Sequence, residues 1–258
     1  MTSGERRNEI QAFLAARGEV AISELASAFD VSEMTIRRDL EQLEDQGVAR
    51  RVMGGAISTV SRSYEPPFAS RAVEAREAKR QIAAAAANLV EFGETAILDV
   101  GSTTLELARC LRGRGGLTVV TPNVRAAIEL AHEPNTRVIL TGGIIRPGEL
   151  SLIGDAAERT FTELNCDVLF LGIGGVHTEK GFTEYNLDDA RIKRAALQAS
   201  SRCIALADAS KLDRICLATV APLEAADVLI TDADPAHPVL AAAREAGVDV
   251  VSTCVPED

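Results

Sequence analysis

The chain has 258 residues, of which 47% are hydrophobic and 25% are charged, so it can bury one large core or two smaller ones. Its formal net charge of −11 excludes a uniform electrostatic affinity for nucleic acid, and any such contact must come from a local cluster of basic residues. No stretch of about eighteen apolar residues occurs, and residues 1–20 lack the pattern of a signal peptide. We therefore expect a cytoplasmic protein without a membrane partner.

Five cysteines and three histidines are scattered along the chain. The cysteines lack the paired spacing of metal and redox motifs, and the histidines are too dispersed for a local metal site. We expect the cysteines to be small apolar residues buried in a reducing compartment. The sequence predicts no metal and no other cofactor.

The first 31 residues show the pattern of two short helices. Ile10 and Leu14 share one face of the first helix, which we expect to end at Gly18. Ser23 is expected to cap the second helix, and a turn through Asp30 follows it.

A third helix begins after Ser32, a good N-cap residue. One stripe of it is expected to be buried, formed by Ile36, Leu40 and Leu43. Gly47 is expected to end this helix in a left-handed conformation. Three helices in this order form a helix-turn-helix.

Four arginines lie on this third helix and just after it. Arg37 and Arg38 fall off the buried stripe and face outward, as on a helix that enters the major groove of B-DNA. Residues 48–58 are expected to form two short strands around Gly54–Gly55, which makes a wing with Arg50 and Arg51 at its root.

The alternative is that these arginines are solvated charges on an ordinary three-helix unit. Residues 1–60 carry seven arginines, no lysine and ten acidic residues, a net charge of −3. Because four of the seven arginines occur at the proposed recognition helix and wing, the complete arrangement favours DNA contact over simple solvation.

The pattern changes after the wing. Residues 58–70 gather serines and the Pro66–Pro67 pair, which predicts a linker, and residues 71–90 predict a helix. Beyond Phe92, seven short apolar strands alternate with amphipathic helices, which indicates an α/β domain with a mostly parallel sheet. The expected domains are therefore 1–57, a linker 58–70, and 71–258.

Polar and glycine residues follow the predicted strands at five places. They are Asp99–Thr104, Thr121–Asn123, Thr141–Gly143, Gly172–Gly175 and Asp208–Lys211. Since parallel sheets bind ligands at the carboxyl ends of their strands, these loops are expected to converge on one crevice. A helix N-terminus with hydroxyls and a lysine suit a phosphate, while carboxylates and an amide suit sugar hydroxyls.

The N-terminal motif resembles the signature of DeoR-type transcriptional regulators, V-S-x-x-T-I-R-R-D-L followed by L-x-x-x-G and a wing with G-G-A. It stands here as Val31–Leu40, Leu43, Gly47 and Gly54–Ala56. Met53 departs from the family, which usually has histidine at that place in the wing. The residues expected to meet DNA are Ser32, Thr35, Arg37, Arg38, Arg50 and Arg51.

The strand ends resemble the C-terminal domain of the same family, which is similar to the ribose-5-phosphate isomerase fold. The shared patterns are D-x-G-[ST]-T, T-x-N, G-G-x-x-R-P and D-x-S-K, and the segment Gly181–Glu184 and the helix that contains Lys193 also follow the family. The resemblance implies an effector site for a phosphorylated sugar. Its expected residues are Asp99, Gly101, Ser102, Thr103, Thr104, Asn123, Gly142, Gly143, Arg146, Gly174, Gly175, Glu184, Asp208, Ser210 and Lys211.

The resemblance implies a repressor of a sugar-catabolic operon, acting as a dimer or tetramer on double-stranded operator DNA and released by the phosphorylated sugar. The competing hypothesis is a sugar-phosphate isomerase or deaminase with Asp208 or Glu184 as the base. The acidic D-G-A-D motif of the related isomerases is replaced by Gly172-Ile-Gly-Gly, which favours binding without turnover and predicts no catalytic residue. A protein–protein scaffold would explain neither polar constellation.

Overall fold

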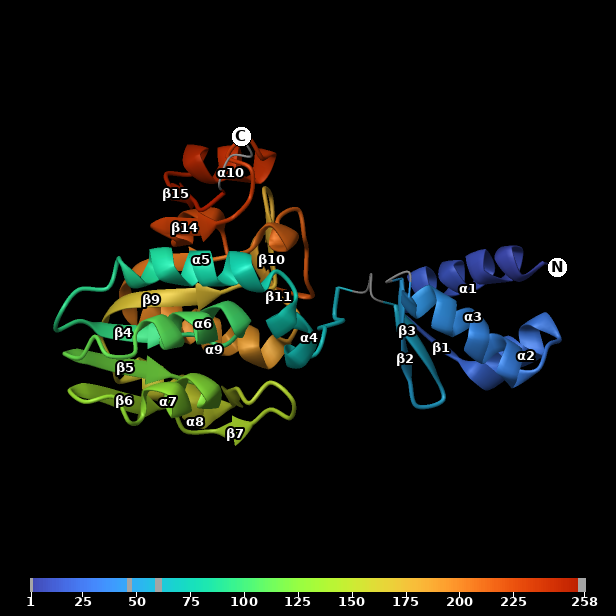
Figure 1. Cartoon of the computed structure of the whole chain (residues 1–258), viewed down its shortest axis with the longest axis horizontal. Helices are drawn as coiled ribbons and strands as arrows, with labels where there is room; N and C mark the ends of the chain where they lie inside the picture. The colour runs from blue at the N-terminus through green and yellow to red at the C-terminus, as the bar shows by residue number, and fades with distance from the viewer. Residues whose placement is uncertain (1, 46–47, 59–61, 255–258) are drawn as a thin grey trace. The chain divides into compact units, whose positions relative to one another are not determined.

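The computed structural model describes residues 2–45, 48–58 and 62–254, and the chain divides into two compact units (Figure 1). The first unit comprises Met1–Pro66 and the second Pro67–Asp258. Residues 59–61 of the expected linker lie outside the described residues. At the other end of that segment, helix α4 (Phe68–Val73) has already begun, so the expected linker is partly helical.

Three helices and a small sheet make up the N-terminal unit. The helices are α1 (Ser3–Arg17), α2 (Ile22–Phe29) and α3 (Glu33–Asp45). Thr2 and Glu5 form a reciprocal capping box at the start of α1, and Gly18 ends it with φ +80°. The predicted cap of α2 is wrong, because Ser23 lies inside its first turn. Gly47, the predicted end of α3, lies outside the described residues.

The sheet of this unit is antiparallel and has the order β1-β3-β2. Its strands are β1 (Glu19–Ala21), β2 (Ala49–Val52) and β3 (Gly55–Ser58). The predicted hairpin is confirmed, and Gly54 at its tip has φ +86°. The sequence does not predict β1, because three residues are too few to show an alternating pattern. A Cβ added at Gly55 would lie 2.1 Å from the carbonyl oxygen of Val20, so β3 needs glycine where it passes β1.

One apolar core joins these helices to the sheet. Its buried members are Ile10, Leu14, Val20, Ile22, Leu25, Ile36, Leu40, Leu43, Ala49 and Ala56. The predicted stripe on α3 is confirmed, since none of its three side chains is more than 1% exposed. Asp39 is also buried on α3 and accepts a hydrogen bond from Nε of Arg6 on α1 at 2.5 Å. A buried ion pair therefore fixes α1 against the helix that carries the exposed arginines.

A seven-stranded parallel sheet forms the centre of the C-terminal unit. Its strands are β4 (Thr95–Leu98), β5 (Leu117–Thr121), β6 (Thr136–Leu140), β9 (Cys166–Gly172), β12 (Ser200–Leu206), β14 (Val228–Thr231) and β15 (Asp249–Ser252). They lie in the order β15-β14-β12-β9-β4-β5-β6. All seven predicted strands and their parallel pairing are confirmed.

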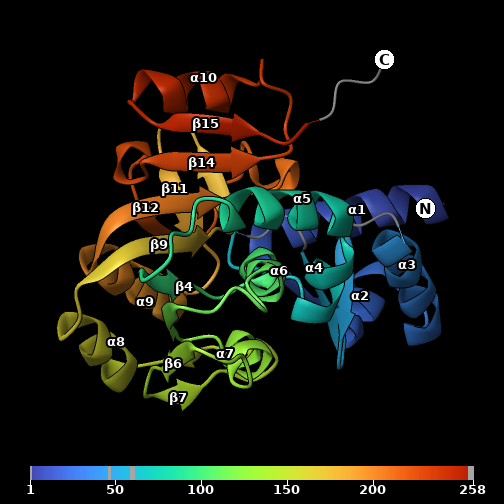
Figure 2. The same cartoon turned by 60° about the vertical axis from the view of Figure 1, so that its left-hand side comes forward.

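Helices cover both faces of this sheet (Figures 1 and 2). One face carries α5 (Arg76–Ala87), α6 (Ser102–Cys110) and α7 (Val124–Leu130), and the other carries α8 (Asp155–Thr162), α9 (Leu187–Gln198) and α10 (Pro238–Glu245). In β9, Val168 and Phe170 pack into the first layer, whereas Leu169 and Leu171 pack into the second. Burial on both sides explains why the strands are apolar at nearly every position.

The helix predicted for residues 71–90 is in fact two helices, α4 and α5, separated at Ala75 by a left-handed φ of +48°. Short strands outside the large sheet were not predicted, because two to four residues show no periodicity. They are β7 (Ile144–Ile145), β8 (Leu152–Ile153), β10 (Gly175–His177), β11 (Gly181–Glu184) and β13 (Ala218–Ala221). The expectation of buried cysteines fails at Cys110, which is half-buried, and at Cys254, which is exposed.

Candidate nucleic-acid interface and ligand site

The start of α3 is fixed by its own side chains. The Ser32 hydroxyl accepts a hydrogen bond from the backbone N–H of Thr35 at 3.3 Å, which confirms the predicted cap. The two hydroxyl oxygens lie 3.0 Å apart. Ser32 is exposed and Thr35 is half-buried, so both can still reach a ligand at this end of the helix.

Arg37 and Arg38 are exposed on α3, as predicted. Arg37 lies 3.4 Å from the Glu33 carboxylate one turn earlier, in an ion pair whose side chains are both about half exposed to solvent. The side chain of Arg38 makes no hydrogen bond or ion pair with any residue that the structure describes. Because exposed pairs are weak, both guanidinium groups can turn toward a phosphate or a base.

The arginines of the wing have partners within the N-terminal unit. Nε of Arg51 donates to Glu44 of α3 at 2.6 Å, its backbone N–H donates to the same carboxylate at 2.9 Å, and Glu41 lies 3.5 Å from Nη1. The hydrogen bond from the Arg51 backbone lowers the pKa of the Glu44 carboxyl. Arg50 is half-buried and donates to the Tyr64 hydroxyl at 3.4 Å. Arg51 therefore ties the wing to α3 as well as facing solvent.

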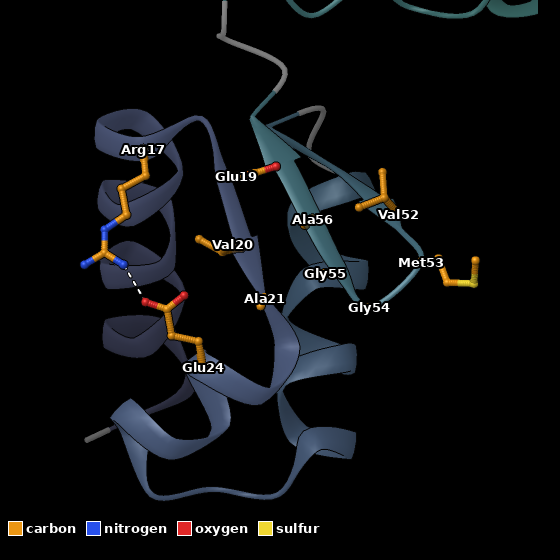
Figure 3. Close-up of a pocket in the computed structure, with 10 residues that line it drawn as sticks. All are labelled: Arg17, Glu19, Val20, Ala21, Glu24, Val52, Met53, Gly54, Gly55 and Ala56. Carbon is orange, nitrogen blue, oxygen red and sulfur yellow. Dashed lines mark hydrogen bonds and ion pairs between the residues drawn. The ribbon is translucent and has the colours of Figure 1, made fainter.

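A groove of about 420 Å³ runs along the wing and β1, beside the end of α1 (Figure 3). Arg17 on its rim donates to Glu24 at 2.5 Å, and Glu19 adds a second carboxylate. At the tip of the hairpin, Met53 is fully exposed and points away from the sheet (Figure 3). The groove lacks the excess positive charge that a phosphate backbone needs, so the basic surface lies with α3 and the root of the wing.

The five polar loops of the C-terminal unit follow strands that lie side by side. The order β12-β9-β4-β5-β6 places the segments that begin at Asp208, Gly172, Asp99, Thr121 and Thr141 along one edge of the sheet. Their neighbours in register include Leu206 with Gly172 and Thr121 with Leu140. The strand order thus places all five loops at one edge of the sheet, while their convergence on one crevice stays a prediction.

Lys193 of α9 joins two of these segments to the end of β11. Its Nζ lies 2.5 Å from Asp99, 3.2 Å from Glu184 and 2.9 Å from the carbonyl oxygen of Gly172. Asp99 also accepts a hydrogen bond from the backbone N–H of Gly172 at 3.0 Å. Complete burial raises the pKa of Asp99 to about 6, against the opposing effect of the Lys193 charge.

A second network surrounds Asp208, which follows β12. Its carboxylate lies 3.0 Å from Nζ of Lys79 on α5 and accepts a hydrogen bond from the backbone of Ser210 at 3.1 Å. Burial and the nearby cations lower the pKa of Lys211, whose side chain makes no hydrogen bond or ion pair with any described residue. Lys211 is thus a buried cation whose three donors are available to an anionic ligand.

Two predicted ligand residues already have partners in the fold. The side-chain oxygen of Asn123 accepts from the backbone N–H groups of Arg125 and Ala126 and so caps α7. Arg146 lies 2.7 Å from Asp189 of α9, a carboxylate that also accepts from the Ser151 hydroxyl at 3.0 Å. Asn123 and Arg146 therefore each have a structural role in addition to the ligand contact that the sequence predicts.

The start of α6 offers an anion both backbone N–H groups and hydroxyls. Gly101 precedes the helix with φ +131°, and the Thr104 hydroxyl donates back to its carbonyl oxygen at 3.0 Å. The Ser102 and Thr103 hydroxyls make no hydrogen bond with any described residue. Because the first N–H groups of a helix lack partners within it, this turn can accept a phosphate.

Three of the predicted glycines, Gly143, Gly174 and Gly175, allow close packing. A Cβ added at Gly175 would lie 2.4 Å from the carbonyl oxygen of Arg214, and one at Gly143 would lie 2.4 Å from that of Ile153. At Gly174, an added Cβ would come within 3.1 Å of the Glu184 carboxylate. Gly142 is exposed and has ordinary contacts, so the fold itself does not require it.

Just beyond the ends of β4, β5 and β6, three buried polar side-chain atoms lack a hydrogen-bond partner among the described residues. They are Oδ1 of Asp99, Nδ2 of Asn123 and Oγ1 of Thr141, which follow the adjacent strands β4, β5 and β6. Buried polar groups are rarely left unpaired, because each one costs about 1–3 kcal/mol. An acceptor, an amide donor and a hydroxyl in this order suit a ligand with several hydroxyl groups.

The sequence gives no signal for Lys79, since a single lysine on an amphipathic helix resembles a surface residue. The helix that contains Lys193 follows the family pattern, but its sequence does not indicate the contacts that this lysine makes. In the described part of the chain, no group of three or more histidine, cysteine or acidic side chains has the geometry to hold a metal ion. None of the described helices is long and apolar enough to cross a membrane.

Comparison with known families identifies both units. Residues 6–62 match the family described as "DeoR-like helix-turn-helix domain", and residues 74–233 match "DeoR C terminal sensor domain". The two matches occur in the same order as the two units of the structure.

Relatives of known designation align along nearly the whole chain. The HTH-type transcriptional regulator GolR of Listeria innocua is 37% identical over 88% of this chain and 90% of its own length. The glycerol-3-phosphate regulon repressor of Escherichia coli is 32% identical over 91% and 93%. Ribose 5-phosphate isomerase A of Methanocaldococcus jannaschii is similar in structure over 54% of this chain and 55% of its own, at 16% identity and a TM-score of 0.41.

Proposed function

This chain belongs to the DeoR family of DNA-binding transcriptional regulators, and we propose that it represses a sugar-catabolic operon until a phosphorylated sugar binds its C-terminal unit. The family is one of regulators rather than enzymes. Its site of action is then the compartment that holds the chromosome, which in bacteria is the cytoplasm.

On the DNA side, two copies of the chain place two α3 helices on the half-sites of an inverted repeat. Arg38, which has no partner among the described residues, and Arg37, which has a weak one, supply the base and phosphate contacts. Ser32 and Thr35 set the register through phosphate, while Arg50 and Arg51 support the wing near the backbone. A dimer or tetramer supplies the two copies that this arrangement requires.

On the effector side, the three unpaired buried atoms at the ends of β4, β5 and β6 carry the proposal. They take the hydroxyl groups of the ligand, and the start of α6 together with Lys211 takes its phosphate. The regulon named for the Escherichia coli relative supports a phosphorylated polyol or sugar as the class of ligand. Glycerol 3-phosphate, hexose phosphates and deoxyribose phosphates all carry the required groups.

The alternative enzymatic use of this edge has little support in the geometry. Glu184 faces Lys193 at 3.2 Å, and Asp208 faces Lys79 at 3.0 Å. Both carboxylates suggested as bases thus have buried cations as neighbours, and these ion pairs hold them within the fold. We assign these groups to the organisation of the binding site.

Fluorescence anisotropy on DNA from the regions upstream of the chain's own gene and its neighbours tests the proposal at fixed salt, with and without a panel of phosphorylated sugars. Arg38→Ala should weaken specific binding by about 1–3 kcal/mol and leave effector binding unchanged. Arg80→Ala, an exposed arginine of α5, is the matched control.

Lys211→Ala should bind the same DNA and respond poorly to the sugar phosphate. Normal release in this variant would place the phosphate elsewhere at the edge. Failure of the unmodified protein to bind any sequence specifically, even after selection from random DNA, would overturn the proposed function.

A further inference from the structure

The apolar side chains left exposed in the N-terminal unit gather on the elements proposed to meet DNA. Among the described residues of this unit, the exposed large hydrophobic side chains are Met34, Val52 and Met53, with exposures of 60%, 45% and 103%. Met34 lies in the first turn of α3, and the other two lie in the wing. The chain contains three methionines, the third being Met1, so both internal ones occupy this surface.

Met34 shares its face of α3 with the two arginines. It precedes Arg37 by three positions and Arg38 by four, spacings that bring side chains together on a helix surface. The first turn of a recognition helix is the part that reaches base edges in helix-turn-helix proteins. Met34 therefore lies between the charged groups and the end of the helix that enters the groove.

Met34 has no role in the core that would explain an apolar residue here. The buried side of α3 is already filled by Ile36, Leu40 and Leu43, each at most 1% exposed. An apolar side chain in water gains free energy when a partner covers it, and the positive charge beside it selects a partner that carries phosphate. DNA meets both conditions in its major groove.

We propose that Met34 reads thymine by packing its thioether against the thymine C5-methyl group in the major groove, an inference that rests on the proposed binding of DNA through α3. Thymine alone presents a methyl group there, whereas arginine recognises O6 and N7 of guanine. The unbranched, polarisable side chain of methionine adapts its shape to such a contact. The operator half-site should then contain a thymine beside the base pairs read by Arg37 and Arg38.

A double-mutant cycle between protein and DNA tests this contact. Each thymine of the half-site is replaced in turn by deoxyuridine, which lacks only the methyl group, and binding is measured for the full-length protein and for Met34→Ala. At one thymine the replacement should weaken binding about fourfold, the loss that corresponds to about 0.8 kcal/mol for one methyl-sized group. Met34→Ala should weaken binding to the natural operator about tenfold and be insensitive to that replacement.

Two further variants act as controls. Met34→Leu keeps an apolar side chain of similar volume and should bind the operator within about threefold of the unmodified protein, with its dependence on the methyl group retained. Met53→Ala, at the tip of the wing, should retain the full fourfold effect of the same deoxyuridine, because its side chain belongs to a different element. The slope of affinity against salt should be unchanged in Met34→Ala, since no charge is removed.

The failures of the two proposals are distinguishable. If the unmodified protein binds its operator and Arg38→Ala weakens that binding, while Met34→Ala and the deoxyuridine replacements act additively at every thymine, the methyl contact is absent and this inference is wrong. If Met34→Ala loses affinity equally for every DNA sequence, Met34 contacts the sugar–phosphate backbone instead. If the unmodified protein binds no specific sequence, the proposed function itself fails.

Discussion

Charged pairs at the two proposed binding surfaces differ mainly in their exposure to water. Around the recognition surface, the side chains of the Arg37–Glu33 pair are 52% and 55% exposed. At the strand ends of the C-terminal unit, those of the Lys193–Asp99 pair are 2% and 1% exposed. Because water competes with exposed pairs, the arginines can exchange a carboxylate for a phosphate at small cost. Lys193 cannot, and we expect it to shape the proposed ligand site instead.

Removing the cation at the centre of the buried network should have the largest effect. Lys193→Met leaves the carboxylates of Asp99 and Glu184 buried without a positive partner, and we expect a loss of about 3–5 kcal/mol in the unfolding free energy of the C-terminal unit. Urea unfolding followed by circular dichroism measures it. Lys180→Met, at an exposed lysine, should change stability by less than about 0.5 kcal/mol. Equal losses in the two variants would show that burial does not separate the two classes of pair.

The contrast between exposed and buried pairs can also be tested within the N-terminal unit, where Arg6 and Asp39 form a buried pair. Asp39→Ala leaves Arg6 without its 2.5 Å partner and should destabilise this unit by about 2–3 kcal/mol. Hydrogen exchange of the backbone amides in α1 and α3 reports the change locally. Glu33→Ala, which removes an exposed carboxylate from the same helix, is the control and should leave exchange in α1 unaltered.

The pH dependence of stability sharpens the same contrast. The pKa of Asp99 is raised to about 6 in the folded protein, above the ordinary value near 3.9, so the folded state binds its proton more tightly than the unfolded state does. Its contribution to stability should therefore fall as pH rises from about 4 through 6, by up to about 1.4 kcal/mol per pH unit. Urea unfolding between pH 4 and pH 7 should show this slope in the unmodified protein and lose it in Asp99→Asn. An identical slope in both proteins would assign the titration to another group.

The smallest effect is expected at the exposed pair between the wing and α3. Glu44→Gln weakens the 2.6 Å contact with Arg51, yet the paired groups remain in water, so the loss of stability should be less than about 1 kcal/mol. Thermal unfolding of the variant beside Arg51→Ala and the double variant gives the coupling directly. A coupling above about 2 kcal/mol would place this pair with the buried ones.

The sequence predicts those features that are formed by residues close to one another along the chain. The cap at Ser32, the buried stripe and the outward arginines of α3 all follow from the period of one helix, and the strand-end loops follow from the rule for parallel sheets. The buried networks could not be predicted in the same way. Lys193 meets Asp99 and Glu184 only because α9, β4 and β11 come together in the fold, and none of these segments marks the others in the sequence.

Contacts within the fold also give structural roles to residues that the sequence predicts as ligand contacts. Asn123 and Arg146 were expected as ligand contacts, yet one caps α7 and the other pairs with Asp189. Met34 shows the converse: the period of α3 places it off the buried stripe, but only the structure shows that this apolar side chain is exposed and has no place in the core.

The strand between α1 and α2 has a mechanical consequence for control of the operator. Because β3 pairs with β1 on one side and with β2 on the other, the wing cannot swing without breaking the ladder that joins it to the helices. We therefore expect α3 and the wing to move together as one rigid body. In the proposed dimer, a signal that releases DNA would change the separation or tilt of two whole N-terminal units against half-sites spaced by about 34 Å, rather than unfold a hairpin.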